Sequence, residues 1–224
     1  MNIQIKSCIK GAKEAEGIAV IIDVFRASNT IIAMLAQGVG SIVPVGSLKE
    51  AYRLKRENPD YLLFGERNGL PPEGFDYGNS PAEASKLQLH GKKAIITTSA
   101  GSQGIVNASN ADEILVGSFA NVSTVVNYVR HKNSENVSLV AIGCEAKVKA
   151  EEDEQCALYM KNLLEGNSSD FDVMKKAILR SDGANRLKRL NQQDDLEFAL
   201  KLDLYKIVPK VFKENDIEVV RSEK

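Results

Sequence analysis

The sequence feature that most restricts the fold is an unbroken apolar segment at residues 17–24, GIAVIIDV, which is followed directly by a helical pattern. Polar and apolar side chains do not alternate within it, so we expect a strand that is buried on both faces. The helix that follows, at residues 30–38, ends at Gly38, because glycine readily adopts the left-handed conformation that terminates helices. A doubly buried strand followed by a helix predicts one β-α unit of a parallel sheet.

The same alternation of strand and helix continues along the chain. Strands are predicted at residues 41–45, 61–65, 92–98, 113–117 and 137–143, and helices from Ser47, after residues 99–104, after Asn121 and from Glu151 to Leu164. Ser47 with Glu50 three residues later predicts a capping box. Beyond Gly166 charged helical patterns replace the apolar runs, and residues 216–220 are the last predicted strand. The patterns predict a single α/β domain, residues 1–224, with three α/β/α layers and a largely parallel or mixed central sheet.

Composition excludes several classes of protein. The chain has 29 basic and 30 acidic residues, a net charge of −1, which gives no electrostatic reason to expect nucleic acid or an anionic membrane as a partner. Residues 1–7 lack the apolar core of a signal peptide, and no segment approaches the roughly 20 apolar residues that span a bilayer. Three widely spaced cysteines, Cys8, Cys144 and Cys156, favour a reducing compartment over a disulfide framework. We therefore expect a soluble cytoplasmic protein.

The few histidines limit the kind of metal site. His90 and His131 are the only two in the sequence, and the cysteines lack the paired spacing of a zinc site. Any metal must therefore be bound mainly by carboxylates and water.

In parallel α/β sheets, ligands bind outside the carboxyl ends of the strands, and the first polar cluster at such an end is residues 23–30. Asp23, Arg26 and Ser28 stand between strand and helix, where free backbone N–H groups and a guanidinium can grip phosphate or sulfonate oxygens. The alternative is structural: Ser28 or Asn29 caps the helix, and Arg26 pairs with Asp23.

The second cluster is the glycine- and proline-rich segment 65–81. Its composition permits no regular element, and a loop of this length in a compact domain is usually functional or disordered. Glu66, Arg67, Asp76 and Asn79 project polar groups from it, as expected for a rigid substrate-binding loop. A surface Ω-loop without chemistry is the alternative.

Two further clusters are weaker signals. Thr98, Gly101 and Ser102 form a hydroxyl-rich glycine turn after a predicted strand, but no Gly-Lys-Ser/Thr follows, which counts against a nucleoside triphosphatase. Residues 151–154, EEDE, stand at a helix start, where they complement the helix dipole or, if Asp153 points inward, join Asp23 in holding Mg²⁺.

Other nucleophile schemes do not fit the sequence. Cys144 is not followed by an arginine at the spacing of cysteine phosphatases, and Asp23 lacks the second aspartate that haloacid-dehalogenase-like phosphatases carry two residues later. Ser102 does not match the serine elbow of α/β hydrolases.

The polar clusters together resemble the ordered motifs of the 2-phosphosulfolactate phosphatase family. The segments that carry the resemblance are Ile22–Ser28 (IDVFRAS), Gly65–Gly69 (GERNG), Pro72–Pro81 (PEGFDYGNSP) and Glu152–Ala157 (EDEQCA). Order and spacing agree over about residues 18–160, residues 203–209 resemble the family's C-terminal segment, and the loop at 65–81 is the most specific element.

The resemblance implies a Mg²⁺-dependent hydrolase that removes phosphate from 2-phospho-3-sulfolactate, a step toward coenzyme M. The chain departs from the family at two places: residues 99–103 replace an Asn-Gly-Thr-Arg loop, which puts Gln103 where an arginine is usual, and Leu158 stands where glycine is common. These departures predict a reshaped pocket, so the reaction class is better supported than the substrate.

The resulting hypothesis assigns roles at one edge of the sheet. Asp23, with Glu66 or Asp153, positions Mg²⁺ on the phosphate, while Arg26 and Arg67 neutralise its oxygens and hold the carboxylate or sulfonate. Six more residues are predicted to bind substrate: Ser28, Asn68, Asn79, Thr98, Gly101 and Ser102. Direct attack by water and an aspartyl-phosphate at Asp23 both remain open, as does a homo-oligomer. The alternatives are a phosphatase of another small phospho-acid or sugar phosphate, and a non-catalytic anion-binding protein.

Overall fold

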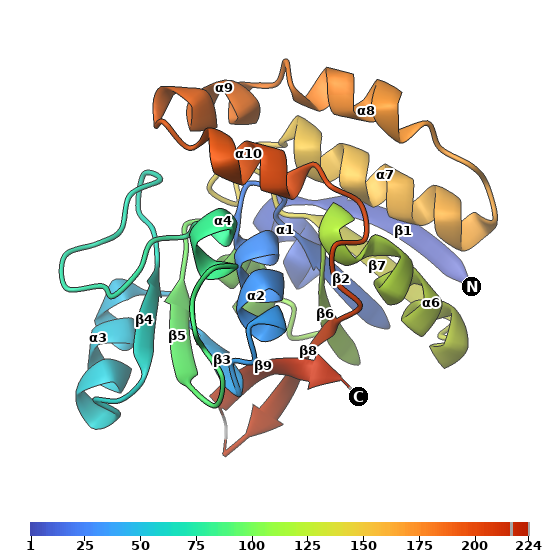
Figure 1. Ribbon diagram of the computed structural model, residues 1–224. Coiled ribbons are helices and arrows are strands. Elements are labelled where there is room, and N and C mark those ends of the chain that lie inside the picture. The colour runs from blue at the N-terminus through green and yellow to red at the C-terminus, as the bar shows by residue number, and fades with distance from the viewer. Residues whose placement is uncertain (216, 224) are drawn as a thin grey trace.

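The computed structural model describes residues 1–215 and 217–223, whose elements alternate as Figure 1 shows. The strands are β1 (Asn2–Ser7), β2 (Ile18–Ile22), β3 (Ser41–Pro44), β4 (Leu62–Gly65), β5 (Lys93–Thr97), β6 (Glu113–Gly117), β7 (Asn136–Ala141), β8 (Val208–Glu214) and β9 (Ile217–Glu223). The helices are α1 (Cys8–Lys13), α2 (Ala27–Ala36), α3 (Leu48–Glu57), α4 (Pro81–Ala84), α5 (Gly101–Asn107), the 3₁₀ turn η1 (Phe119–Asn121), α6 (Val122–Lys132), α7 (Glu151–Glu165), α8 (Phe171–Ile178), α9 (Asp182–Arg189) and α10 (Gln193–Ala199).

The described strands form one mixed sheet in the order β1-β7-β2-β6-β8-β9-β3-β5-β4. Two blocks within it are parallel, β1-β7-β2-β6 and β3-β5-β4. The antiparallel hairpin β8–β9 lies between the blocks, and a single residue pair joins it to each side: Leu115 with Lys210, and Ile42 with Val220. The predicted largely parallel or mixed sheet is therefore confirmed.

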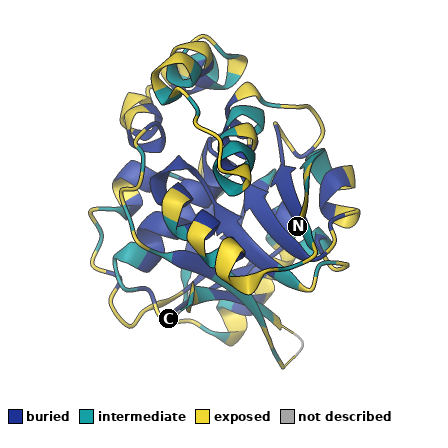
Figure 2. Ribbon diagram, turned by 90° about the vertical axis from the view of Figure 1, so that its right-hand side faces the viewer, coloured by how far each residue is buried: buried dark blue, intermediate teal, exposed yellow. Residues whose placement is uncertain are grey.

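Helices cover both faces of the sheet, which confirms the predicted three layers. Consecutive residues of β2 point to opposite sides: Val20 packs with side chains of α6, α7 and α9, and Ile21 packs with those of α1, α2 and α5. A third cluster places α3 against the outer strands β4 and β5. Figure 2 shows the result, buried strands in the centre and exposed surface on the outer sides of the helices. Burial on both faces explains the continuous apolar runs of the central strands.

Most predicted elements are present, and the N-cap at Ser47 is confirmed because its side chain accepts a hydrogen bond from the Glu50 N–H at 3.2 Å. The last predicted strand corresponds to β9, although Asp216 lies outside the described residues. Two strands escaped prediction, β1 and β8. Both are only partly buried and carry charged residues, so neither has the apolar run that marks a central strand.

The C-terminal helices are placed above the end of the sheet. In Figure 1, α8, α9 and α10 lie across the top of the molecule, over the ends of the central strands, and α10 packs against α4. Within residues 1–215 and 217–223, no helix combines the length and apolar character that crossing a bilayer requires.

Candidate active site

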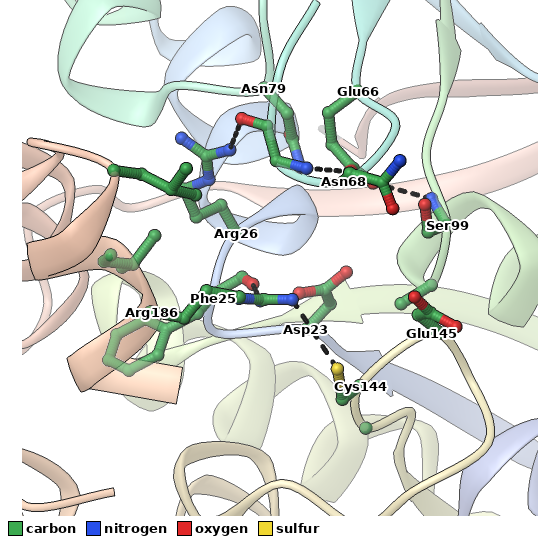
Figure 3. Close-up of a pocket in the computed structure, with 15 residues that line it drawn as sticks. Asp23, Phe25, Arg26, Glu66, Asn68, Asn79, Ser99, Cys144, Glu145 and Arg186 are labelled. Atoms are coloured by element: carbon green, nitrogen blue, oxygen red, sulfur yellow. Dashed lines mark hydrogen bonds between the residues drawn. The ribbon is translucent and has the colours of Figure 1, made fainter. Parts of the chain in front are cut away.

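Residues that follow four strands meet in one small cavity, which we call the central cavity. Asp23 follows β2, Glu66 follows β4, Ser99 follows β5, and residues 143–145 follow β7. The cavity measures about 40 Å³. Its lining is Asp23, Phe25, Arg26, Glu66, Asn68, Gly69, Asn79, Ser99, Ala100, Gly143, Cys144, Glu145, Arg186, Leu187 and Leu190 (Figure 3). Both parallel blocks contribute to it, as expected for a site at the carboxyl ends of strands.

Asp23 is the most buried carboxylate of this cavity. Burial raises the pKa of Asp23 to about 7, the negative charge of Glu66 adds to this, and Arg186 opposes it. The backbone N–H groups of Ala27 and Gly101, at the starts of α2 and α5, face its side chain and favour the charged form, which acts to lower its pKa. A Cβ on Gly101 would lie 2.8 Å from Asp23 Oδ2, so this close approach of backbone to carboxylate requires a glycine.

Glu66 fixes the shape of the loop that carries it. One carboxylate oxygen accepts from the Ser99 N–H at 2.7 Å and the other from the Gly69 N–H at 2.8 Å. Residues 66–80 contain no helix or strand, as predicted. The Glu66 carboxylate is therefore tied to both β4 and β5 at the edge of the cavity, where it and Asp23 bring two negative charges into the same lining.

Arg26 lines the cavity, but its charge is compensated inside the protein. Its guanidinium donates to Asp195 Oδ2 at 2.7 Å and to the Gly69 carbonyl at 3.0 Å, and the side chains of this ion pair are only 4% and 3% exposed. Asp195 of α10 also accepts from the Ser80 hydroxyl at 2.5 Å and the Ala82 N–H at 3.1 Å. The alternative interpretation, in which Arg26 pairs with Asp23, is therefore wrong.

Ser28 binds the backbone of Asp23 on the side away from the cavity. Its hydroxyl accepts from the Asp23 N–H at 2.9 Å and donates to the Ile21 carbonyl at 3.2 Å, and α2 has no side-chain cap. Ser28 is buried and does not line the cavity.

Asp153 also lies behind the cavity rather than in its lining. Its carboxylate accepts from the Val24 N–H at 2.7 Å and the Gly143 N–H at 2.9 Å, which joins the ends of β2 and β7. Burial raises its pKa well above the usual value, and the charges of Asp23 and Glu152 act in the same direction. The structure thus gives both oxygens of Asp153 to backbone donors, and its role as a metal ligand stays a prediction.

Several predicted substrate-binding residues lie in a neighbouring depression, which we call the side pocket. It measures about 550 Å³ and contains Arg67, Thr98 and Gln103, and it shares Asn68, Ser99 and Glu145 with the central cavity. Arg67 is held there by the Thr97 hydroxyl at 2.9 Å and by backbone carbonyls. Ser102 is buried and bonds to Thr98, and it lines neither space.

Asn79 and Asn68 line the central cavity, as predicted for substrate-binding residues. Asn79 is only 4% exposed, yet its Oδ1 atom has no hydrogen-bond partner among the residues that the structure describes. Because a buried amide without a partner is costly, this atom is a candidate contact for a ligand.

Sequence reasoning missed Arg186, Cys144 and Glu145, which all line the cavity. Figure 3 shows the Arg186 side chain extending from α9 toward Asp23. Its guanidinium donates to the Phe25 carbonyl at 3.2 Å and lies 3.5 Å from Cys144 Sγ. Arg186 stands among the basic residues of a charged helix, so no local sequence signal separates it from a solvent-exposed arginine.

The two departures from the expected family pattern have different consequences. Leu158 is 38% exposed on α7 and lines neither the cavity nor the side pocket, so the expectation that it reshapes the pocket is wrong. Gln103 does line the side pocket, where its amide donates to the Gly46 carbonyl at 2.7 Å.

The cavity offers hard oxygen ligands and cations side by side. Over the described ranges, no three histidine, cysteine, aspartate or glutamate side chains are arranged to hold a metal by themselves. Three carboxylates, Asp23, Glu66 and the exposed Glu145, share the lining with two guanidinium groups, Arg26 and Arg186. This set suits a divalent cation that takes part of its shell from an anionic ligand and water, together with the anion itself.

Comparison with known proteins places these features in context. The family model for 2-phosphosulpholactate phosphatase matches residues 3–214. Curated relatives described as probable 2-phosphosulfolactate phosphatases include proteins of Thermotoga petrophila, 34% identical over 85% of this chain and 87% of the relative, and Caldicellulosiruptor saccharolyticus, 36% identical over 84% and 86%. A third, from Thermoplasma volcanium, is 35% identical over 89% and 92%.

Proposed function

Because the chain belongs to the 2-phosphosulfolactate phosphatase family, we propose that it is a Mg²⁺-dependent phosphatase that hydrolyses 2-phospho-3-sulfolactate to 3-sulfolactate and phosphate. The observation that carries the proposal is that Asp23 and Glu66, the two less exposed carboxylates of the lining, share one cavity with two guanidinium groups. Phosphate ester hydrolysis depends mainly on alignment and charge stabilisation, which such a set supplies.

The residues fit a magnesium ion. Asp23 and Glu66 are in electrostatic contact, and among the described residues no ion pair within 4 Å neutralises either of them. Magnesium in proteins is typically held by one or two carboxylates, with water and substrate phosphate completing the shell. When bound, Mg²⁺ would polarise a phosphoryl oxygen and offset the developing negative charge.

The chain's own groups would position the phosphoryl group and the attacking oxygen. The N–H groups of Ala27 and Gly101 favour the charged form of Asp23, and hydrogen bonds from Ser99 and Gly69 fix the orientation of the Glu66 carboxylate. Asp23 would either orient a water molecule or attack phosphorus itself. Beryllium fluoride distinguishes these routes, since an adduct bonded to Asp23 requires the covalent one.

The sizes of the two spaces support a division of the substrate between them. The central cavity, at about 40 Å³, is far below the ~300 Å³ of typical ligand sites, whereas the adjoining side pocket measures about 550 Å³. The central cavity would take the phosphoryl group and the side pocket the organic acid. Arg67 in the side pocket is a cation for the carboxylate or sulfonate.

The test is phosphate release from a panel of phospho-acids and sugar phosphates, each with Mg²⁺ and with EDTA. We expect 2-phospho-3-sulfolactate to be hydrolysed with the highest kcat/KM and EDTA to abolish turnover, with activity restored by added Mg²⁺. Faster hydrolysis of another phosphate ester would make that compound the preferred substrate. Undiminished turnover in EDTA would contradict the proposed dependence on Mg²⁺. Release from no compound in the panel would favour a non-catalytic anion-binding protein.

A further inference from the structure

The two arginines of the central cavity are bound in opposite ways. Arg26 forms an ion pair with Asp195 at 2.7 Å, and both side chains are almost completely buried. Its second hydrogen bond, to the Gly69 carbonyl, ties it to the loop that carries Glu66. A guanidinium whose charge is already compensated and whose position is fixed on two sides serves first to hold the cavity together.

Arg186 is held by neutral groups only. Its contacts are the Phe25 carbonyl oxygen at 3.2 Å and Cys144 Sγ at 3.5 Å, and within the described ranges no carboxylate lies within ion-pair distance of it. A guanidinium carries five N–H donors in a planar fork, so the two contacts leave donors for a bound anion. Arg186 therefore brings a positive charge into the lining that the protein itself does not neutralise at close range.

The surroundings of Arg186 point independently to a ligand. Asn79 lines the same cavity with a buried, unpartnered Oδ1 atom. The positive charge of Arg186 acts on Asp23, whose carboxylate is the one proposed to meet the phosphoryl group. Figure 3 shows the guanidinium directed at the space beside Asp23.

We infer that Arg186, contributed by α9, is the guanidinium that binds the phosphoryl oxygens of the substrate, and that Arg26 positions the cavity wall. This assignment rests on the proposed phosphatase function, but it is testable with inorganic phosphate alone. It also makes the C-terminal helices part of the active site, because α9 delivers the phosphate-binding group from above the strand ends.

Cys144 provides a readout that does not depend on turnover. Its thiol is exposed and adjoins Arg186, whereas Cys156 is buried and Cys8 lies outside the cavity lining. Inorganic phosphate bound to Arg186 should slow alkylation of Cys144 by iodoacetamide, followed by peptide mass spectrometry with Cys8 as the internal reference. The ratio of rates with and without phosphate is compared within each variant, because removing Arg186 also changes the environment of the thiol.

The variants are Arg186→Gln, Arg186→Lys and the matched control Arg189→Gln, which removes an exposed arginine from the same helix. We expect Arg186→Gln to weaken phosphate protection and kcat/KM by about 10- to 100-fold, the range for a lost charge-assisted hydrogen bond. Arg186→Lys should recover part of both, because it keeps the charge without the planar fork. Arg189→Gln should behave as the wild type.

The outcomes separate this inference from the proposed function. Arg186-dependent protection by phosphate, in a protein that hydrolyses no phospho-acid, would uphold the inference and refute the phosphatase. Equal protection in Arg186→Gln and in the wild type, or no protection in the wild type, would overturn the inference even if the protein is an active phosphatase. A larger loss of protection in Arg26→Gln than in Arg186→Gln, at equal unfolding free energies, would reverse the two roles and overturn it as well.

Discussion

The floor and the roof of the central cavity are built on different physical principles. The floor consists of strand ends, where Asp23 and Glu66 line the cavity and Asp153 of α7 lies directly behind it. Backbone N–H groups next to the strand ends bind the carboxylates of Glu66 and Asp153. The roof consists of α9 and α10, and a buried ion pair between Arg26 and Asp195 attaches it. The floor concentrates negative charge and the roof brings a positive one, Arg186. The floor is thus expected to govern chemistry, and the roof to govern assembly of the site and anion binding.

The largest expected effect is the loss of turnover on removing the charge of the floor. Asp23→Asn keeps the shape of the side chain and its place under α2 and α5, but it deletes the proposed metal-binding or nucleophilic oxygen. We expect kcat to fall at least about 10³-fold, equivalent to ~4 kcal/mol of transition-state stabilisation. Steady-state phosphate release measures this, with the exposed Asp60→Asn as the matched control.

The fold of Asp23→Asn should remain intact, as circular dichroism and an unfolding curve can show. If the variant unfolds, or if it retains turnover close to that of the control, the floor does not have the purely chemical role that separates it from the roof.

The next effect concerns the attachment of the roof. Asp195→Ala leaves the Arg26 guanidinium buried without its partner, and it also removes the acceptor of the Ser80 hydroxyl and the Ala82 N–H. Breaking a buried pair from one side typically costs about 3–5 kcal/mol of unfolding free energy. Urea denaturation measures the loss, and Asp194→Ala, an exposed neighbour on α10, should change stability by less than about 0.5 kcal/mol.

A double variant sharpens this test of the roof. Arg26→Met combined with Asp195→Leu leaves no unpaired buried charge, so it should recover part of the stability that Asp195→Ala loses. If Asp195→Ala is as stable as its control, the ion pair does not attach the roof, and the contrast with the floor fails.

The contrast between floor and roof also explains which parts of the site could be predicted from the sequence. The floor was predictable, because a strand buried on both faces leaves an unbroken apolar run and the polar residue that ends it, such as Asp23 or Glu66, stands out. The roof was not, because Arg186 and Asp195 lie on short helices whose charged residues look like any solvated face. Only tertiary packing buries Asp195 and directs Arg186 inward.

The sequence also could not predict which groups the buried charged side chains bind, for a similar reason. Arg26 was expected at the phosphate, and the structure does place it in the cavity lining, but its closest partner is 169 positions away. Asp153 was predicted to bind Mg²⁺ on the condition that it points inward; it is buried, and its oxygens bond to two backbone N–H groups. The residue types predicted which side chains gather at the strand ends. Their hydrogen-bond and ion-pair partners depended on contacts between residues distant in sequence.

The smallest expected effect on stability concerns the C-terminal hairpin, β8 and β9. An ion pair that is more accessible than that of Arg26 and Asp195 attaches it to the first residue of β6, on the side of the sheet away from the cavity. Lys210 of β8 is paired with Glu113 at the start of β6, and it also lies 3.2 Å from the Tyr128 hydroxyl. Burial raises the pKa of Glu113, but hydrogen bonds from Lys210 and Tyr128 outweigh this and hold it below the usual value. The same pair raises the pKa of Lys210 to about 12, against the lowering effect of burial.

Glu113→Gln should therefore destabilise the protein at neutral pH by no more than about 1 kcal/mol, and less in high salt. A carboxylate whose pKa is lowered by folding stabilises the folded state fully above its unfolded pKa and loses that contribution as the pH falls through its folded pKa. The stability difference between wild type and Glu113→Gln should accordingly be constant near pH 7 and shrink below about pH 4.5. Urea denaturation at several pH values measures this stability difference. Turnover at pH 7 should be unchanged, because Glu113 is the first residue of β6 and does not line the cavity. A cost as large as that of Asp195→Ala would show that the distal attachment supports the fold as strongly as the roof does, and the distinction between buried and accessible attachment would be lost.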